Sequence, residues 1–169
     1  MGHNLNYNEA RKLIDNGDLV SIRTSHGIMG NLTKYFTRSD YTHCGIAIWI
    51  EGGLYIGELN GGRNHLTPLS QYENAEFDVF YPPRGLKSDT IKDSVMKKLR
   101  SQIDYGYLAF VAIGITEWLK LKAYPNWRNT LVCSSWCITV YEDAGWSKQS
   151  HLISPGGLSK MLDLKLSVG

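Results

Sequence analysis

The chain of 169 residues is long enough for one well-buried core and short for two, and its 43% hydrophobic and 20% charged residues are typical of a soluble globular domain. Its 18 basic and 16 acidic residues leave a formal net charge of +2 with no long basic run, which argues against a nucleic-acid partner. Three cysteines are an odd number, so a complete disulfide framework is excluded.

The sequence carries no sign of export or membrane insertion. Met1–Glu9 lacks the apolar stretch of a signal peptide. The longest apolar run, Tyr107–Thr116, falls well below the ~20 residues that span a bilayer. We expect no transmembrane segment, and either a cytoplasmic location or delivery by lysis or in a virus particle.

Hydrophobic periodicity divides the chain into short helices and strands. In the first half it predicts a helix at Asn8–Asn16 closed by Gly17, a strand at Leu19–Arg23, a short helix at Ser25–Arg38, a hairpin of Tyr41–Ile50 and Leu54–Leu59, and a strand at Phe77–Tyr81. In the second half it predicts a helix starting near Asp89 with Asp89 or Ser88 as N-cap, a mostly buried helix at Tyr107–Lys122, a helix at Leu131–Ala144 closed by Gly145, and a final short helix or strand after a break at Ser154–Gly157. Because there is no internal repeat and no low-complexity linker, we predict one α+β domain over residues 1–169.

Strand alternation separates His43 from its neighbour Cys44. His43 and Trp49 share one face of the predicted strand, whereas Cys44 and the following isoleucines share the other, entirely apolar face. Cys44 is therefore expected in the core and is a poor candidate for a nucleophile. Taken alone, His43 fits a hydrogen-bonded structural histidine as well as a catalytic base.

Cys133 and Cys137 lie one helical turn apart on one stripe, and they differ in their place on the helix. Cys133 falls at the helix start, where unpaired amides and the macrodipole favour a thiolate, and a thiolate is the nucleophilic form of cysteine. Cys137 lies inside the helix among apolar residues. The residues alone leave Cys133 open between a core position and a nucleophile.

Glu58 lies on the strand predicted to pair with the His43 strand. A carboxylate there could orient the imidazole through its second nitrogen, and a solvated strand-end carboxylate is the alternative. His26 and His65 fall in polar stretches and are expected to be exposed. Cys133, Cys137 and His43 could together bind zinc, but the usual two close-set ligand pairs are absent, so we predict no metal and no cofactor.

The order of these segments resembles the circularly permuted papain-like amidases, the YiiX-like branch of the NlpC superfamily, which is related to lecithin retinol acyltransferase. The matching segments, in chain order, are Gly17–Val20, Phe36–Ile46, Tyr55–Leu59, Leu66–Tyr72, Leu131–Cys137 and Ile153–Leu158. The resemblance implies a small antiparallel sheet or barrel packed against helices, with the nucleophile at the N-terminus of a helix.

The resemblance also implies a role for each matching site residue. Cys133 corresponds to the nucleophile, His43 to the general base and Glu58 to the polar residue that orients the imidazole. The backbone amides of Cys133 and Ser134 become candidates for the oxyanion hole. Candidates for the substrate groove are Tyr41, Trp49, Ser135 and Trp136. Ser135 stands where the family has a glutamate, Val132 where it has an aromatic residue and Cys44 where it has an aliphatic one. These differences concern the groove more than the catalytic residues, so they affect the choice of substrate more than the type of reaction.

Three hypotheses for the function follow. The first is a thiol amidase or peptidase that acts through a thioester acyl-enzyme, with a cell-wall peptide as the leading substrate. The second is a lipid-directed thiol acyltransferase or esterase, for which Tyr107–Leu121 could line an acyl groove. The third is a non-catalytic binding or structural protein, associated with a virus particle for example, that keeps the fold.

Overall fold

The computed structural model describes residues 5–23, 40–60, 63–101, 133–151 and 153–169, and its centre is one antiparallel sheet. The six strands are ordered β4-β3-β2-β1-β5-β6 across the sheet. Their bounds are β1 (Leu19–Ile22), β2 (His43–Ile50), β3 (Gly53–Asn60), β4 (Arg63–Pro68), β5 (Phe77–Phe80) and β6 (Leu164–Val168). All five strand pairings are antiparallel.

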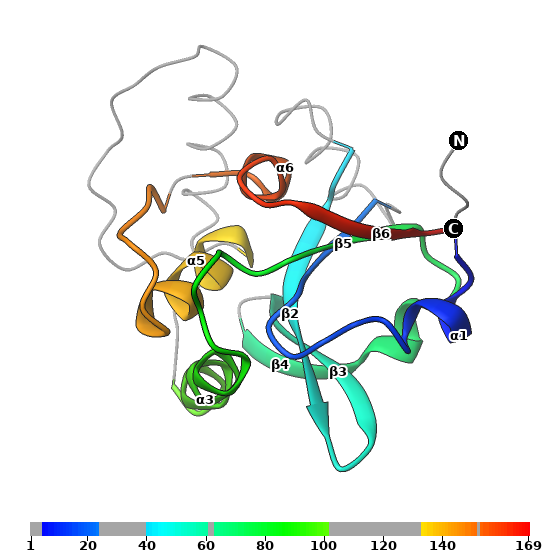
Figure 1. Ribbon diagram of the computed structural model, residues 1–169, viewed down its shortest axis with the longest axis horizontal. Helices are drawn as coiled ribbons and strands as arrows, with labels where there is room; N and C mark the ends of the chain where they lie inside the picture. Colours follow the sequence, from blue (N-terminus) through cyan, green and yellow to red (C-terminus); the bar gives the residue numbers. More distant parts are fainter. Residues whose placement is uncertain (1–4, 24–39, 61–62, 102–132, 152) are drawn as a thin grey trace.

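Helices cover both sides of this curved sheet (Figure 1). The described helices are α1 (Tyr7–Ala10), the 3-10 helix η1 (Leu69–Tyr72), α3 (Ser88–Leu99), α5 (Cys133–Asp143) and α6 (Pro155–Ser159). Helix α5 packs on β2 and β3, α3 packs on α5, and α6 packs on β1. Helix α1 lies on the opposite side of the sheet from α5 (Figure 1). The predicted α+β class is confirmed at this level.

Strand β2 separates two hydrophobic cores, as its alternation predicts. Cys44, Ile46 and Ile48 point into the core shared with α3, α5 and α6. Ala47 points into the second core, which α1, η1 and the other face of the sheet enclose. Each core residue of β2 is completely buried, so a one-residue slip of this strand would exchange its two faces and is strongly disfavoured.

The predicted hairpin of β2 and β3 is also confirmed. Its two turn residues, Glu51 and Gly52, have φ values of 47° and 80°. Two consecutive left-handed residues are typical of the type I′ turn, whose twist matches that of the flanking strands. The turn pairs Ile50 with Gly53 and fixes the register that brings Gly57 opposite Ile46.

Two helix boundaries differ from the sequence prediction. Helix α1 spans only Tyr7–Ala10 instead of reaching Asn16; a capping box of Asn6 and Glu9 starts it, and turns follow it up to Gly17. So short a segment gains few helical hydrogen bonds for the cost of nucleation, and burial of Ala10 and Ile14 is reached without a longer helix. Helix α3 begins at Ser88 after Lys87, with no side-chain cap, rather than after Ser88 or Asp89.

The C-terminal part contains both a helix and a strand. Ser154 caps α6 through a hydrogen bond from the Gly157 amide, and β6 then pairs with β5 at the edge of the sheet. The sequence pattern does not predict strand β4, because a largely exposed edge strand shows no apolar alternation. The predicted helices at Ser25–Arg38 and Tyr107–Lys122, together with His26, lie outside the described residues.

Candidate active site

The first residue of β2 and a buried carboxylate of β3 form the centre of the site. The Nε2 atom of His43 lies 2.6 Å from Oε2 of Glu58. Glu58 is 1% exposed, whereas the His43 side chain keeps 19% of its surface accessible. The carboxylate is therefore a buried partner that holds one nitrogen of a partly accessible imidazole.

Two hydroxyl groups hold Glu58 in turn. Thr67 of β4 donates to Oε1 over 2.6 Å, and the phenol of Tyr72 in η1 donates to Oε2 over 3.0 Å. Burial raises the pKa of Glu58, but His43, Thr67 and Tyr72 outweigh it and hold that pKa below its usual value. The ionised form of Glu58 is thus the stable one in this setting. Sequence reasoning missed both hydroxyls, because it did not recognise β4.

The thiol of Cys133, at the start of α5, lies close enough to the same imidazole to raise its pKa. Since Nε2 of His43 is committed to Glu58, Nδ1 is the ring nitrogen that remains for the thiol. The structure thus brings together the three residues that the sequence singles out, from β2, β3 and α5. His65, by contrast, is exposed on β4.

The proton affinities of His43 and Cys133 are linked. Burial lowers the pKa of His43, but the hydrogen bonds to Cys133 and Glu58 outweigh it and raise that pKa to about 10. The imidazole is therefore basic enough to hold a proton released by a thiol. The Cys44 thiol and burial raise the pKa of Cys133 well above its usual value, and the interaction with His43 offsets only part of this rise.

Cys44 is closer to this site than alternation suggests. Its side chain is completely buried in the core under α5, as predicted. Cys133 packs against that core, and both the Cys44 thiol and the His43 imidazole affect its pKa. The predicted core position of Cys44 is thus next to the candidate nucleophile.

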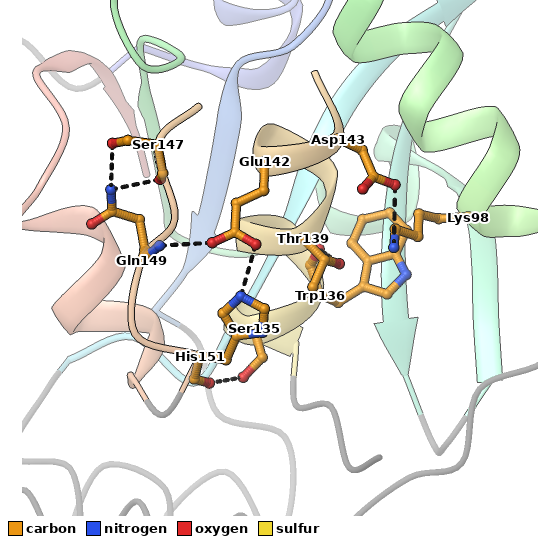
Figure 2. Close-up of polar contacts among 9 residues, drawn as sticks. All are labelled: Lys98, Ser135, Trp136, Thr139, Glu142, Asp143, Ser147, Gln149 and His151. Atoms are coloured by element: carbon orange, nitrogen blue, oxygen red, sulfur yellow. Dashed lines mark hydrogen bonds and ion pairs between the residues drawn. The ribbon is translucent and has the colours of Figure 1, made fainter. Parts of the chain in front are cut away.

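The second half of α5 anchors the segment that follows it, as Figure 2 shows. Both carboxylate oxygens of Glu142 are used: Oε1 accepts the amide of Gln149 over 2.7 Å, and Oε2 lies 2.8 Å from Nε2 of His151. The hydroxyl of Ser135 donates to the carbonyl of His151. The segment around residues 149–151 is therefore fixed along the helix.

Two more contacts fix the position of α5 itself. The hydroxyl of Ser134 donates to the carbonyl of Ile153, next to the nucleophile candidate. On the opposite side, Lys98 of α3 pairs with Asp143 over 3.3 Å (Figure 2). The described part of α5 begins at Cys133. Amides in the first turn of a helix have no acceptor within the helix, so they can serve as donors for a ligand.

Three of the four predicted groove residues are held by contacts within the fold. Ser135 and Trp136 are 1% and 0% exposed and belong to the packing of α5, because they face the segment after the helix and the sheet. Trp49 lies six residues along β2 from His43, roughly 20 Å away at the rise of a strand. Its indole donates to the carbonyl of Ile14 instead. The described contacts of these three side chains are thus with the protein itself, and their place in a groove stays a prediction.

Tyr41 is half-buried close to the start of β2. Its phenol donates to Asp78 over 2.5 Å, and its ring meets Phe80 edge-on. Arg23 pairs with the same carboxylate over 3.2 Å. Tyr41 remains a candidate for the groove, with its hydroxyl engaged in this cluster.

Comparisons with known proteins support the fold alone. No protein-family model matches the chain, and no curated protein matches it by sequence. Among solved structures it is similar to the metalloprotein yiiX from Escherichia coli O157:H7, with a TM-score of 0.56 and 21% sequence identity. The match covers 79% of this chain and 67% of that one. The YiiX-like fold expected from the sequence is thus supported by structural similarity.

Within the described part of the chain, no group of three or more His, Cys, Asp or Glu side chains is arranged to hold a metal ion. Among the helices that the structure describes, none is both long and apolar enough to cross a membrane.

Proposed function

We propose that the protein is a thiol-dependent hydrolase with a circularly permuted papain-like, NlpC-type fold. In this proposal Cys133 is the nucleophile, His43 the general base and Glu58 the residue that orients the imidazole. The bridging position of His43, between a buried carboxylate 2.6 Å away and the thiol of Cys133, carries the proposal.

The reaction begins with the proton of Cys133. In the reactive pair this proton resides on Nδ1 of His43, whose raised pKa favours the imidazolium, and Glu58, which stays ionised, stabilises that cation. The thiolate attacks the carbonyl carbon of an amide or ester, and the proton on His43 passes to the leaving group. Water then attacks the thioester with His43 as base and releases the acid. Positioned acid–base help of this kind contributes ~100-fold or more to the rate.

The backbone at the start of α5 supplies the electrostatic part. We propose that the amides of Cys133 and Ser134 bind the oxyanion of the tetrahedral intermediate, aided by the positive end of the helix dipole. The hydroxyl of Ser134 is already committed to the carbonyl of Ile153, which keeps this turn in place. Loss of one such amide donor typically costs ~3 kcal/mol of transition-state stabilisation.

A peptide amide, with cell-wall peptides first, is the substrate class that we propose. This choice follows from the resemblance to the permuted papain-like amidases. An acyl lipid is the alternative, and a binding protein that has kept the fold is the third possibility.

Thiol reactivity tests the catalytic proposal. We expect iodoacetamide to label Cys133 faster than an ordinary thiol near neutral pH, and His43→Ala to abolish this advantage. Cys137→Ala is the matched control, because it removes a thiol of the same helix that is completely buried. If all three thiols react only as ordinary thiols of pKa ~8.5, the catalytic proposal is wrong.

Turnover tests the substrate class. Peptidoglycan fragments and acyl lipids are incubated with the protein, with Cys133→Ala and with Cys137→Ala. We expect release of product from the peptide fragments, its loss in Cys133→Ala and its retention in Cys137→Ala. Turnover of acyl lipids alone would assign the lipid-directed alternative. Release by Cys133→Ala at the wild-type rate would remove Cys133 from the mechanism.

A further inference from the structure

The three cysteines form one cluster beneath the start of α5. The Sγ atom of Cys137 lies 3.9 Å from that of Cys44, and both side chains are completely buried. Cys133 is partly exposed and packs against the core that contains Cys44, and the Cys44 thiol raises its pKa. Cys44 thus lies beside both thiols of the helix, and all three are free. The hydrolase mechanism uses only one of them.

Exposure decides which thiol of this cluster an oxidant reaches first. Oxidation of a cysteine requires access and thiolate character. Cys133 is partly exposed and has the imidazole of His43 as its partner. Cys44 is completely buried, so an oxidant from solution reaches Cys133 first.

Geometry then decides which thiol can capture an oxidised Cys133. Cys137 is one helical turn away on the same helix, where Cβ atoms are ~5–6 Å apart, beyond the ~3.5–4.5 Å of a disulfide. Cys44 lies on a different element, β2, in the core against which Cys133 packs. A bond from Cys133 to Cys44 therefore needs no unwinding of α5.

We propose that Cys44 and Cys133 form a redox modification site in which Cys44 is the resolving thiol. Hydrogen peroxide oxidises the Cys133 thiolate: an S–O bond forms, the O–O bond breaks, and hydroxide leaves. Cys44 then attacks the sulfur of this sulfenic acid. The S–S bond forms, the S–O bond breaks, and the hydroxyl leaves as water with the proton of Cys44. A dithiol reductant reverses the modification and restores both thiols.

The disulfide would serve the proposed hydrolase, on which this physiological role rests. It removes the nucleophile while the oxidant is present, and it keeps Cys133 from the irreversible sulfinic and sulfonic acids. The disulfide chemistry itself needs only the cysteine cluster. It can therefore be tested whether or not the protein turns over a substrate.

Peptide mapping without reduction tests the site. The folded protein is treated with hydrogen peroxide, quenched, alkylated and digested. We expect a linked Cys44–Cys133 peptide that lacks two hydrogen atoms and disappears after dithiothreitol. Cys137→Ser, which alters an equally buried thiol, should give the same linked peptide. In Cys44→Ser we expect a dimedone adduct of the sulfenic acid on Cys133 instead.

Two results would overturn the proposal. One is accumulation of the Cys133 sulfinic acid in the wild type at the rate seen in Cys44→Ser. The other is a Cys44–Cys137 disulfide in place of the proposed one. If Cys44→Ser fails to fold, the wild type alone decides: sulfinic acid on Cys133 without a linked Cys44–Cys133 peptide overturns the proposal. A linked Cys44–Cys133 peptide in a protein that cleaves no substrate would support this site and refute the hydrolase.

Discussion

Removal of the Thr67 hydroxyl tests whether the carboxylate under His43 depends on its own hydrogen bonds. Thr67→Val keeps the size and the strand preference of the side chain but deletes the donor to Oε1 of Glu58 at 2.6 Å. A hydrogen bond to a charged group contributes ~1.5–3 kcal/mol to stability, and an orphaned buried acceptor costs a similar amount. We therefore expect the free energy of unfolding to fall by about 2 kcal/mol, which is ~30-fold in the unfolding equilibrium.

Urea unfolding at two pH values measures this effect and its origin. Glu58 has a folded-state pKa below its usual value, so its contribution to stability is present above the unfolded pKa and is lost as the pH falls through the folded pKa. The deficit of Thr67→Val should thus be largest near pH 7 and shrink under acidic conditions. A shift of the thermal midpoint by ~4–8 °C at pH 7 corresponds to the same loss.

Thr67→Ser is the matched control, because it keeps the hydroxyl and loses only a methyl group. Its cost should stay near ~0.8 kcal/mol or below. The reasoning fails if Thr67→Val is as stable as Thr67→Ser, or if its deficit is the same at acidic and neutral pH.

Three further predictions concern His43, Gly57 and Lys165. His43 has a folded pKa of about 10 against an ordinary 6.5, so its contribution to stability is complete below pH 6.5 and is lost as the pH rises toward 10. In urea unfolding, the difference in stability between the wild type and His43→Ala should therefore become smaller over that range. A constant difference would contradict the prediction. A methyl group on Gly57 would lie 2.6 Å from Cγ1 of Val95, so Gly57→Ala should lower the unfolding free energy by ~1–3 kcal/mol, and an unchanged urea midpoint would show that α3 yields freely. Lys165 lies 2.8 Å from Asp18, whose side chain is 1% exposed, so Lys165→Met leaves a buried carboxylate without its cationic partner. We expect the free energy of unfolding to fall by ~3 kcal/mol or more in the same assay. A fall below ~1 kcal/mol would show that the pair contributes no more than a surface ion pair.

The central hairpin of the fold could be predicted because its sequence is locally consistent. Apolar alternation in β2, a Gly-containing turn and the apolar residues of β3 all specify the same register. Strand β4 has no such pattern, since it is an edge strand that gains its place from pairing with β3. The length of α1 could not be predicted either, because Ala10 and Ile14 have helical spacing whether or not the helix continues between them.

The candidate site was predictable in its residue types and less so in its surroundings. His43 and Cys133 stand out by their positions at a strand start and a helix start. Thr67 does not stand out, because its role depends on the pairing of β3 with β4, which the residue pattern does not reveal. The core position of Cys44 could be predicted from alternation, but its nearness to Cys133 could not, because alternation does not show which part of that face α5 covers.

Gly57 affects the distance between the two parts of the candidate site. His43 and Glu58 belong to the sheet, where Thr67 and Tyr72 brace the carboxylate, whereas Cys133 belongs to α5, which α3 and the segment after the helix brace. The two halves meet at Gly57, where an added Cβ would touch both Val95 of α3 and Trp136 of α5. Because Gly57 has no side chain, α3 and α5 can pack directly on the backbone of β3. This close packing sets the distance between the thiol on α5 and the imidazole on the sheet.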